Sequence, residues 1–243
     1  MKAIGIIGYK KSGKTTLVTN LARELAKRGY KIATLKHIFQ AKHLDLPFKD
    51  TARHMQYATQ TAAISPAESA LFFNHRKSLE QIIEYLEADF LLVEGFRQEK
   101  TFPKIICFKR SWQVKELFDG LQIGAASLAH PSKMDLGVPV FNIQEDIERI
   151  ADLVEGQAFK LPNLNCGDCG CESCYKLARE IIRGKKNLED CPALKPETQI
   201  TLNGKVFALN PFISQMIRKT IVGMLSSLKG YRKGNIQIKI EDK

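Results

Sequence analysis

The chain has 243 residues, of which 44% are hydrophobic and 26% are charged. This is the composition of an ordinary globular protein, and it excludes a wholly disordered, collagen-like or low-complexity chain. The 37 Lys and Arg residues outnumber the 26 Asp and Glu residues, giving a formal net charge of +11. Because the excess is spread out and no basic stripe is interleaved with aromatic residues, we expect small phosphorylated ligands rather than nucleic acid.

The first part of the chain alternates strand and helix patterns. Strongly apolar runs predict buried parallel strands, and apolar residues at helical spacing predict helices. The predicted strands are 2–8, 31–35, 61–65, 69–73, 89–93, 104–108, 122–126 and 139–143. The predicted helices are 14–28, 50–58, 78–86 and 145–154. This alternation predicts an α/β fold, with a mainly parallel sheet flanked by helices.

The composition changes near residue 158. A linker-like stretch precedes a region that holds five of the six cysteines. Beyond residue 196, Asn203-Gly204 predicts a hairpin between strands 198–202 and 205–209, followed by a helix at 211–228 and a strand at 235–240. We therefore predict an α/β domain at 1–158, a small Cys-rich domain at 159–196 and a C-terminal α+β segment at 197–243.

No apolar run reaches the ~20 residues that a membrane span needs. The N-terminus also lacks the long apolar core and cleavage site of a secretory signal peptide. We expect a cytoplasmic protein that does not bind a membrane.

A phosphate-binding loop is predicted between the first strand and the first helix. Residues 8–15 match the pattern G-x-x-x-x-G-K-S/T in full. The two glycines allow a tight turn in which backbone N–H groups face one anion, and the following helix adds the positive end of its dipole. We expect Lys14 to contact the β- and γ-phosphates and the Thr15 hydroxyl to bind Mg²⁺. The predicted nucleotide-binding residues here are Gly8, Tyr9, Lys10, Lys11, Ser12, Gly13, Lys14, Thr15 and Thr16.

An acidic residue follows the apolar run at 89–93. Glu94 lies at the carboxyl end of a predicted strand, where ligands bind in open α/β sheets. We assign Glu94 to the Mg²⁺ and γ-phosphate region, and Gly95 to a close approach of the backbone. The choice between GTP and ATP stays open. The stretch Ser132-Lys133-Met134-Asp135 resembles the guanine-reading N-K-x-D motif with Ser in place of Asn, and a solvated turn is the alternative.

Four cysteines have the spacing of a metal site. They read Cys166-x2-Cys169-x4-Cys174-x16-Cys191-Pro192, with Cys171 as an extra thiol. Four thiolates ligate either Zn²⁺ or a [4Fe–4S] cluster. Three cysteines bunched within nine residues and a remote fourth before proline favour the cluster. Zinc is the alternative, and disulfides are the least favoured outcome.

Residues 1 to about 155 resemble the molybdopterin-guanine dinucleotide biosynthesis protein B family of P-loop GTP-binding accessory proteins. The resemblance rests on the phosphate loop and on Lys36-His37, Asp45-x-Pro47-x-Lys49-Asp50-Thr51-x-Arg53-His54, Asp89-x4-Glu94-Gly95-Phe96, Pro103-Lys104-Ile105 and Val138-Pro139-Val140. It implies that Asp45, Lys49, Asp50 and Arg53 lie near the nucleotide phosphates or on a partner-facing surface. The chain departs from the family pattern at Phe48, where Gly is usual, and at Thr59-Gln60.

The cysteine segment resembles a different element, the small four-Cys domain of corrinoid iron–sulfur proteins. There, C-G-x-C-G-x4-C followed by a helix and C-P binds one [4Fe–4S] cluster. The resemblance implies that Cys166, Cys169, Cys174 and Cys191 are the ligands, whereas Cys171 has no counterpart.

These resemblances imply a slow GTPase that assists attachment of GMP to molybdopterin, with Lys14, Thr15 and Glu94 carrying the catalysis. The implied cofactors are GTP, Mg²⁺ and the cluster. The implied partners are molybdopterin or its guanine dinucleotide, the molybdenum cofactor guanylyltransferase and a second copy of the chain. The alternatives are an NTPase that inserts nickel or iron–sulfur centres, and a non-enzymatic sensor whose cluster gates nucleotide binding.

Overall fold

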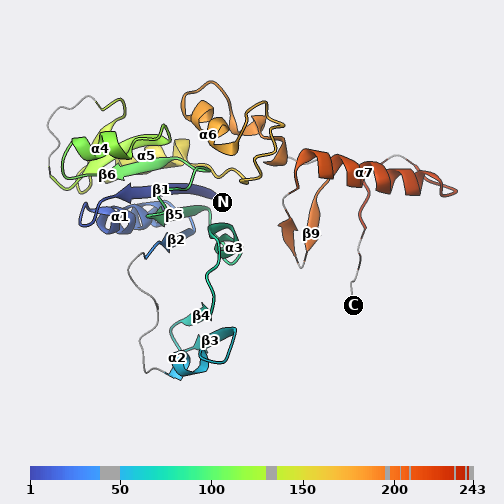
Figure 1. The fold of residues 1–243 in the computed structure, drawn as a ribbon, viewed down its shortest axis with the longest axis horizontal. Coiled ribbons are helices and arrows are strands. Elements are labelled where there is room, and N and C mark those ends of the chain that lie inside the picture. Colours follow the sequence, from blue (N-terminus) through green and yellow to red (C-terminus); the bar gives the residue numbers. More distant parts are fainter. Residues whose placement is uncertain are drawn as a thin grey trace. The chain divides into compact units, whose positions relative to one another are not determined.

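The structure is a computed structural model that describes residues 1–38, 50–129, 136–194, 198–202, 204–207, 209–232, 234–238 and 240. The chain divides into two compact units, Met1–Lys160 and Leu161–Lys243. Figure 1 traces the elements of both units along the chain. Across the described part of the chain, no helix is long and apolar enough to cross a membrane.

Unit 1 is built on a six-stranded sheet in the order β2-β5-β1-β6-β7-β8, with every neighbouring pair parallel. All five residues of β5 are buried, as expected of a central strand covered on both faces. The predicted mainly parallel α/β fold is confirmed. The strands are β1 (Lys2–Gly8), β2 (Ile32–Lys36), β5 (Phe90–Glu94), β6 (Lys104–Cys107), β7 (Gln122–Ser127) and β8 (Val140–Asn142).

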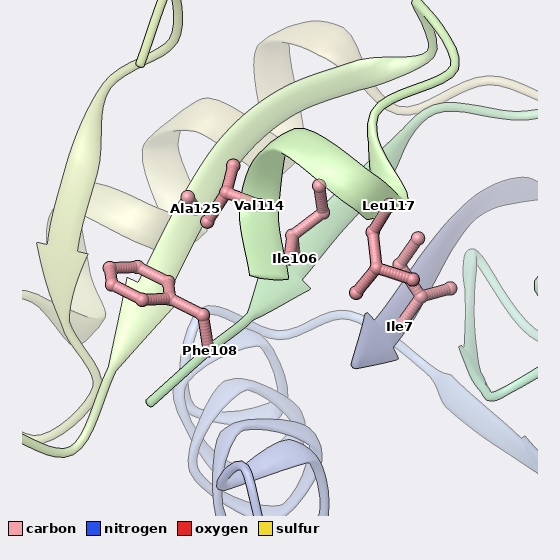
Figure 2. Packing of buried hydrophobic residues seen from close by; sticks show 6 residues of the cluster. All are labelled: Ile7, Ile106, Phe108, Val114, Leu117 and Ala125. Carbon is pink, nitrogen blue, oxygen red and sulfur yellow. The ribbon is translucent and has the colours of Figure 1, made fainter. Parts of the chain in front are cut away.

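Helices cover both faces of this sheet. Because successive strand residues point to opposite faces, one side of β1 contributes Ala3 and Ile7, and the other contributes Ile4 and Ile6. Ile7 packs in a cluster with Val114 and Leu117 of a short helix, as Figure 2 shows. The helices of unit 1 are α1 (Lys14–Lys27), α2 (Asp50–His54), α3 (Leu79–Ile83), α4 (Trp112–Leu117) and α5 (Ile147–Gln157).

Helix α1 places its apolar stripe inward. Leu17, Leu21 and Leu25 recur at helical spacing and have no exposed surface. The helix contacts β1, β5 and α5. It ends before Gly29, whose φ of 92° is one that glycine adopts without strain. The predicted helix at 14–28 is confirmed, and this helix fixes the position of the phosphate loop that precedes it.

Two features of unit 1 differ from the sequence predictions. Strands β3 (Gln60–Ile64) and β4 (Ser69–Phe73) form a separate antiparallel pair rather than part of the main sheet. Helix α4 was not predicted, because six residues are too few to show a helical period. Tertiary packing of Val114 and Leu117 against the sheet stabilises it instead.

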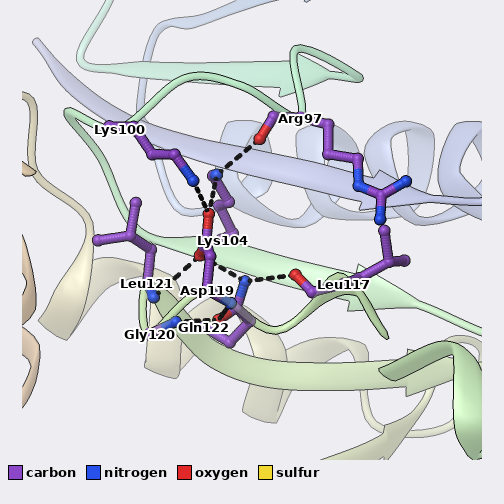
Figure 3. A network of polar contacts seen from close by, with 8 residues as sticks. All are labelled: Arg97, Lys100, Lys104, Leu117, Asp119, Gly120, Leu121 and Gln122. Atoms are coloured by element: carbon purple, nitrogen blue, oxygen red, sulfur yellow. Dashed lines mark hydrogen bonds and ion pairs between the residues drawn. The ribbon is translucent and has the colours of Figure 1, made fainter. Parts of the chain in front are cut away.

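A buried charge network lies at the amino end of β6. The Lys104 side chain has 0% exposure, and its ammonium lies 2.8 Å from a carboxylate oxygen of Asp119 and 3.0 Å from the Arg97 carbonyl oxygen. The same Asp119 oxygen lies 2.5 Å from the ammonium of Lys100. Figure 3 shows the two ammonium groups converging on Asp119. Burial lowers the Lys104 pKa, although the hydrogen bond with Asp119 acts in the opposite direction.

Unit 2 contains the cysteine segment and the C-terminal segment. Its elements are α6 (Cys174–Ile182), two 3₁₀ turns at Leu188–Asp190 and Pro192–Leu194, an antiparallel pair β9 (Ile200–Leu202) and β10 (Lys205–Phe207), and α7 (Pro211–Ser226). The predicted hairpin and late helix are confirmed. The predicted strand at 235–240 is wrong, since residues 234–238 and 240 carry no strand. An alternating pattern forms a strand only beside a hydrogen-bonding partner, and β9 and β10 pair with each other.

Candidate functional site

The phosphate loop begins at Gly8, the last residue of β1, and leads into α1. Its two glycines are required by sterics. A Cβ on Gly8 would lie 2.3 Å from the Cys107 carbonyl oxygen, and one on Gly13 would lie 2.8 Å from a methyl carbon of Ile143. Gly13 also has a φ of 94°, a conformation that L side chains rarely adopt. The loop is therefore pressed against β6 and against the residue that follows β8.

Inside the loop, the Lys14 ammonium donates a hydrogen bond to the Tyr9 carbonyl oxygen at 2.7 Å. Lys10 and Lys11 are exposed, and Lys11 has a φ of 61°. The Ser12 hydroxyl is buried and has no hydrogen-bond partner. A buried polar group without a partner is uncommon and is a candidate contact for a ligand. Thr16 lies in the first turn of α1 and is partly buried.

The structure brings Glu94 to the start of α1. Glu94 is the last residue of β5 and is buried, and its two carboxylate oxygens lie 3.0 and 3.1 Å from the Thr15 hydroxyl. The Lys36 ammonium lies 3.3 Å from one of these oxygens and 3.5 Å from the Thr15 hydroxyl. A hydroxyl, a carboxylate and an ammonium thus meet at the carboxyl edge of the sheet. Hydroxyl and carboxylate oxygens are the hard ligands that Mg²⁺ prefers.

Lys36 was not predicted as a site residue. The position of Lys36 in the chain could have indicated this role, because Lys36 ends β2 and lies in register with Glu94 of the adjacent strand. The neighbouring Gly95 has a φ of 92°, and a Cβ there would lie 3.0 Å from the Cβ of His37. A side chain at position 95 would therefore crowd His37, and the role of Gly95 at the nucleotide stays a prediction.

A cluster that the sequence did not reveal adjoins the loop. The Tyr9 hydroxyl donates to the Glu116 carboxylate of α4, and the Tyr9 ring centre lies 5.8 Å from that of Trp112. The guanidinium carbon of Arg97 lies 6.0 Å from the Tyr9 ring centre. No local motif could have indicated this grouping, because its members come from three separate segments.

Several predicted residues do not join these contacts. Asp45, Lys49 and the guanine-motif stretch 132–135 lie outside the described residues. Asp50 and Arg53 lie on α2, which contacts β3 of the separate hairpin (Figure 1). Their ion pair spans 3.8 Å and both side chains are exposed. Their role at the nucleotide or at a partner stays a prediction.

The cysteine segment of unit 2 buries three of its five thiols. All six thiols of the chain are free, and Cys171, Cys174 and Cys191 are buried. The backbone N–H of Cys174 donates to the Asn165 side chain at 2.8 Å, and the Asn165 N–H donates to the Cys174 sulfur at 3.4 Å. Within the described ranges, no three His, Cys, Asp or Glu side chains are arranged to hold a metal ion.

The chemistry of the donors nevertheless suits a thiophilic metal. Burial raises the pKa of the Cys191 thiol, the backbone N–H groups of Ala193 and Leu194 lower it, and the nearby thiols of Cys174 and Cys169 raise it. Soft thiolates select zinc or iron–sulfur centres. By contrast, Cys107 is a core thiol in β6, and burial raises its pKa to about 12.

The parallel sheet, the glycine-bounded loop and the Thr15–Glu94 contact define a P-loop nucleotide-binding fold. The family model named "Molybdopterin guanine dinucleotide synthesis protein B" matches residues 3–126. The chain belongs to this MobB family. A second model, named "Putative Fe-S cluster", matches residues 161–193. Both resemblances predicted from the sequence are thus confirmed at the level of family and segment.

Known relatives agree with this assignment. A protein of Methanocaldococcus jannaschii, named "Putative molybdopterin-guanine dinucleotide biosynthesis adapter protein", is 30% identical over 236 residues, covering 95% of this chain and 93% of that protein. This match extends over both units. The molybdopterin-guanine dinucleotide biosynthesis adapter protein of Haemophilus influenzae is 28% identical over 158 residues, covering 63% of this chain and 86% of its own length. The crystal structure of Bacillus subtilis MobB covers 65% of this chain and 98% of its own, at a TM-score of 0.55 and 22% identity, which supports the fold.

Proposed function

We propose that the chain binds GTP and Mg²⁺ at the phosphate loop, hydrolyses GTP slowly, and assists the attachment of GMP to molybdopterin. The observation that carries this proposal is the meeting of Thr15, Glu94 and Lys36 beside the loop that holds Lys14. The family and its relatives are named for molybdopterin-guanine dinucleotide, which supports guanine over adenine.

The residues of the loop suit phosphoryl transfer. The Lys14 ammonium has three donors, of which one is held by the Tyr9 carbonyl, so it can turn toward a bound β- or γ-phosphate. The rest of the loop would surround the phosphates, and it consists of Gly8, Lys10, Lys11, Ser12, Gly13 and Thr16. Preorganised cations and N–H groups stabilise charge that develops during transfer, which is the largest catalytic contribution in many enzymes.

Thr15 and Glu94 are the residues that would hold Mg²⁺, and a bound Mg²⁺ neutralises charge on the β- and γ-phosphates. Gly95 keeps the backbone close to this region. We assign no general base for water among the described residues. The proposal therefore includes slow turnover, with binding energy used to deliver nucleotide to a partner rather than to accelerate hydrolysis.

The second unit is proposed to hold a [4Fe–4S] cluster, with zinc as the alternative. Its ligands would be Cys166, Cys169, Cys174 and Cys191, which lie together with Cys171 inside the segment that the family model matches. When bound, such a cluster supplies one-electron redox chemistry, whereas zinc would brace the segment.

The partners are proposed from the family. Its members are named adapter proteins, so we propose a complex with the guanylyltransferase that joins GMP to molybdopterin, and a homodimer. Molybdopterin or its guanine dinucleotide would be the shared ligand. We propose that the phosphates or this partner are contacted by Asp45, Lys49, Asp50 and Arg53. We place the protein in the cytoplasm, where this synthesis would occur.

The test is a calorimetric titration of the full chain with GTP and Mg²⁺. Lys14→Ala is expected to weaken GTP binding roughly 10- to 100-fold, since it removes a charge-assisted phosphate contact. Lys27→Ala is the matched control, because Lys27 lies at the far end of α1 and its side chain is 73% exposed. Equal GTP affinity in the wild type and Lys14→Ala would overturn the site. Tighter binding of ATP than of GTP would overturn the guanine assignment.

A further inference from the structure

Arg97 places a cation beside the side chain of Tyr9 in the phosphate loop. Its guanidinium carbon lies 6.0 Å from the ring centre of Tyr9, the second residue of the loop. One guanidinium nitrogen lies 3.9 Å from a Glu116 carboxylate oxygen, and the Tyr9 hydroxyl donates to the same oxygen. The loop, α4 and the segment after β5 therefore meet at one charged group.

The backbone under Arg97 is held in place. The Gly95 N–H donates to the Ile6 carbonyl at 3.0 Å, and the Phe96 ring centre lies 4.8 Å from that of His37. The Arg97 carbonyl accepts a hydrogen bond from the buried Lys104 ammonium. Figure 3 shows this carbonyl directed at Lys104 and the guanidinium directed away from the network. The backbone of Arg97 is thus held in place, while its guanidinium points outward and is half exposed.

The present partner of Arg97 is a weak one. The side chains of Arg97 and Glu116 are 48% and 50% exposed, and ion pairs between solvated groups contribute little free energy. A triphosphate at the loop carries more negative charge than one carboxylate. The planar guanidinium also matches two phosphate oxygens at once, which an isolated ammonium does not. A phosphate within reach of the guanidinium would therefore compete with Glu116 for Arg97.

We propose that Arg97 binds the terminal phosphate of GTP and makes the site prefer GTP to GDP, while Glu116 holds the guanidinium on Tyr9 when that phosphate is absent. This inference rests on the proposed GTP site. It assigns a specificity role to a residue outside the phosphate-loop motif, and it involves no change in covalent bonding. Only the third phosphate of GTP distinguishes the two ligands at this position.

The experiment compares affinities for GDP and for a slowly hydrolysed GTP analogue, both with Mg²⁺. Arg97→Met is expected to lower affinity for the triphosphate about tenfold and to leave GDP affinity unchanged, because one charge-assisted contact is lost. Glu116→Gln is expected to raise the preference for the triphosphate, since it removes the competing charge but keeps an acceptor for Tyr9. Arg23→Met removes an exposed charge from α1 and serves as the matched control.

Trp112 supplies a readout that does not depend on turnover. It is the only tryptophan of the chain, and its ring centre lies 5.8 Å from the ring centre of Tyr9. Its fluorescence is expected to change with the triphosphate in the wild type, and to change much less in Arg97→Met. Circular dichroism melts of each variant show whether the fold is intact.

Three results would overturn the inference. Arg97→Met could weaken GDP and triphosphate binding equally, it could leave both affinities unchanged, or Glu116→Gln could shift the preference in the same direction as Arg97→Met. A wild-type chain that binds neither nucleotide is a separate result, which would overturn the proposed function and this inference with it.

Discussion

The carboxyl edge of the sheet and the cysteine segment both gather candidate ligand residues, but they differ in what holds those residues together. At the sheet edge, Thr15, Glu94 and Lys36 lie within hydrogen-bonding distance of one another. In the cysteine segment, Cys174 and Cys191 are buried, and the described His, Cys, Asp and Glu side chains form no group of three that could hold a metal ion.

The difference has a physical cause. Parallel strands with a fixed register end at one edge, so backbone hydrogen bonds and a buried core hold Glu94 and Lys36 side by side. Free thiols have no comparable attraction for each other, and a metal or cluster supplies the energy that draws them together. We therefore expect the side chains at the sheet edge to keep their arrangement without a ligand, and the cysteine segment to be completed by its metal or cluster.

The largest expected effect concerns the cysteine segment. Cys191→Ala is expected to remove the bound metal completely, because three ligands do not close the site. Cys171→Ala, which lies outside the ligand pattern, is the control and is expected to keep it. Iron, sulfide and zinc are assayed after anaerobic purification, together with a visible spectrum.

About four iron and four sulfide per chain would support the [4Fe–4S] cluster. One zinc per chain without sulfide would support the zinc site instead. Metal retained by Cys191→Ala and lost by Cys171→Ala would show that the ligand set is wrong.

The next effect concerns the rigidity of the phosphate loop. Gly8→Ala is expected to lower the free energy of unfolding by about 3 kcal/mol, since its Cβ would meet backbone and the Ser12 hydroxyl at 2.5 Å or less. Gly156→Ala in α5 has open space and an ordinary φ, so it is expected to stabilise by about 0.5–1 kcal/mol. Urea denaturation measures both. A Gly8→Ala chain as stable as the wild type would contradict the packed loop.

The buried charge network should give a smaller, pH-dependent effect. Burial acts to raise the Asp119 pKa, but the hydrogen bonds from Lys100 and Lys104 outweigh it and lower the pKa below its usual value of 3.8. The wild type therefore gains stability above that value and loses it as the pH falls through the folded-state pKa.

Asp119→Asn is expected to lower the free energy of unfolding by about 2 kcal/mol at pH 7. This loss is smaller than that expected for a fully buried ion pair, because the Asp119 carboxylate is partly exposed. The difference between the two proteins is expected to shrink as the pH is lowered from about 5 to about 2. Urea denaturation at a series of pH values measures it. A difference independent of pH would show that the charge of Asp119 is not what stabilises Lys104.

The smallest effect concerns Ser12. Its hydroxyl is buried without a partner, so Ser12→Ala is expected to leave the nucleotide-free chain equally stable or more stable by up to about 1 kcal/mol. Ser214→Ala, which removes a hydroxyl that accepts from the Thr198 N–H at 3.1 Å, is expected to destabilise by about 1 kcal/mol. Thermal melts compare the two. Equal losses would indicate that Ser12 has a partner after all.

The sequence alone determined the features that consecutive residues carry. The phosphate loop, the apolar strand that ends in Glu94, the inward stripe of α1 and the cysteine spacing are local patterns, and they were sufficient to predict the α/β fold and the MobB family. The motif also required Gly8 and Gly13, for reasons of backbone geometry that the structure then showed as contacts under 3 Å.

Only the tertiary structure decided which distant side chains meet. Lys36 reaches Glu94 because β2 and β5 share a register. The Arg97 guanidinium lies beside the Tyr9 ring, while the Arg97 carbonyl accepts a hydrogen bond from the buried Lys104. Packing against the sheet also stabilises α4, a segment that is too short to show a helical period. Residues 235–238 have an alternating pattern but form no strand. Such contacts depend on register and packing between segments far apart in the chain, and local residue patterns do not encode either one.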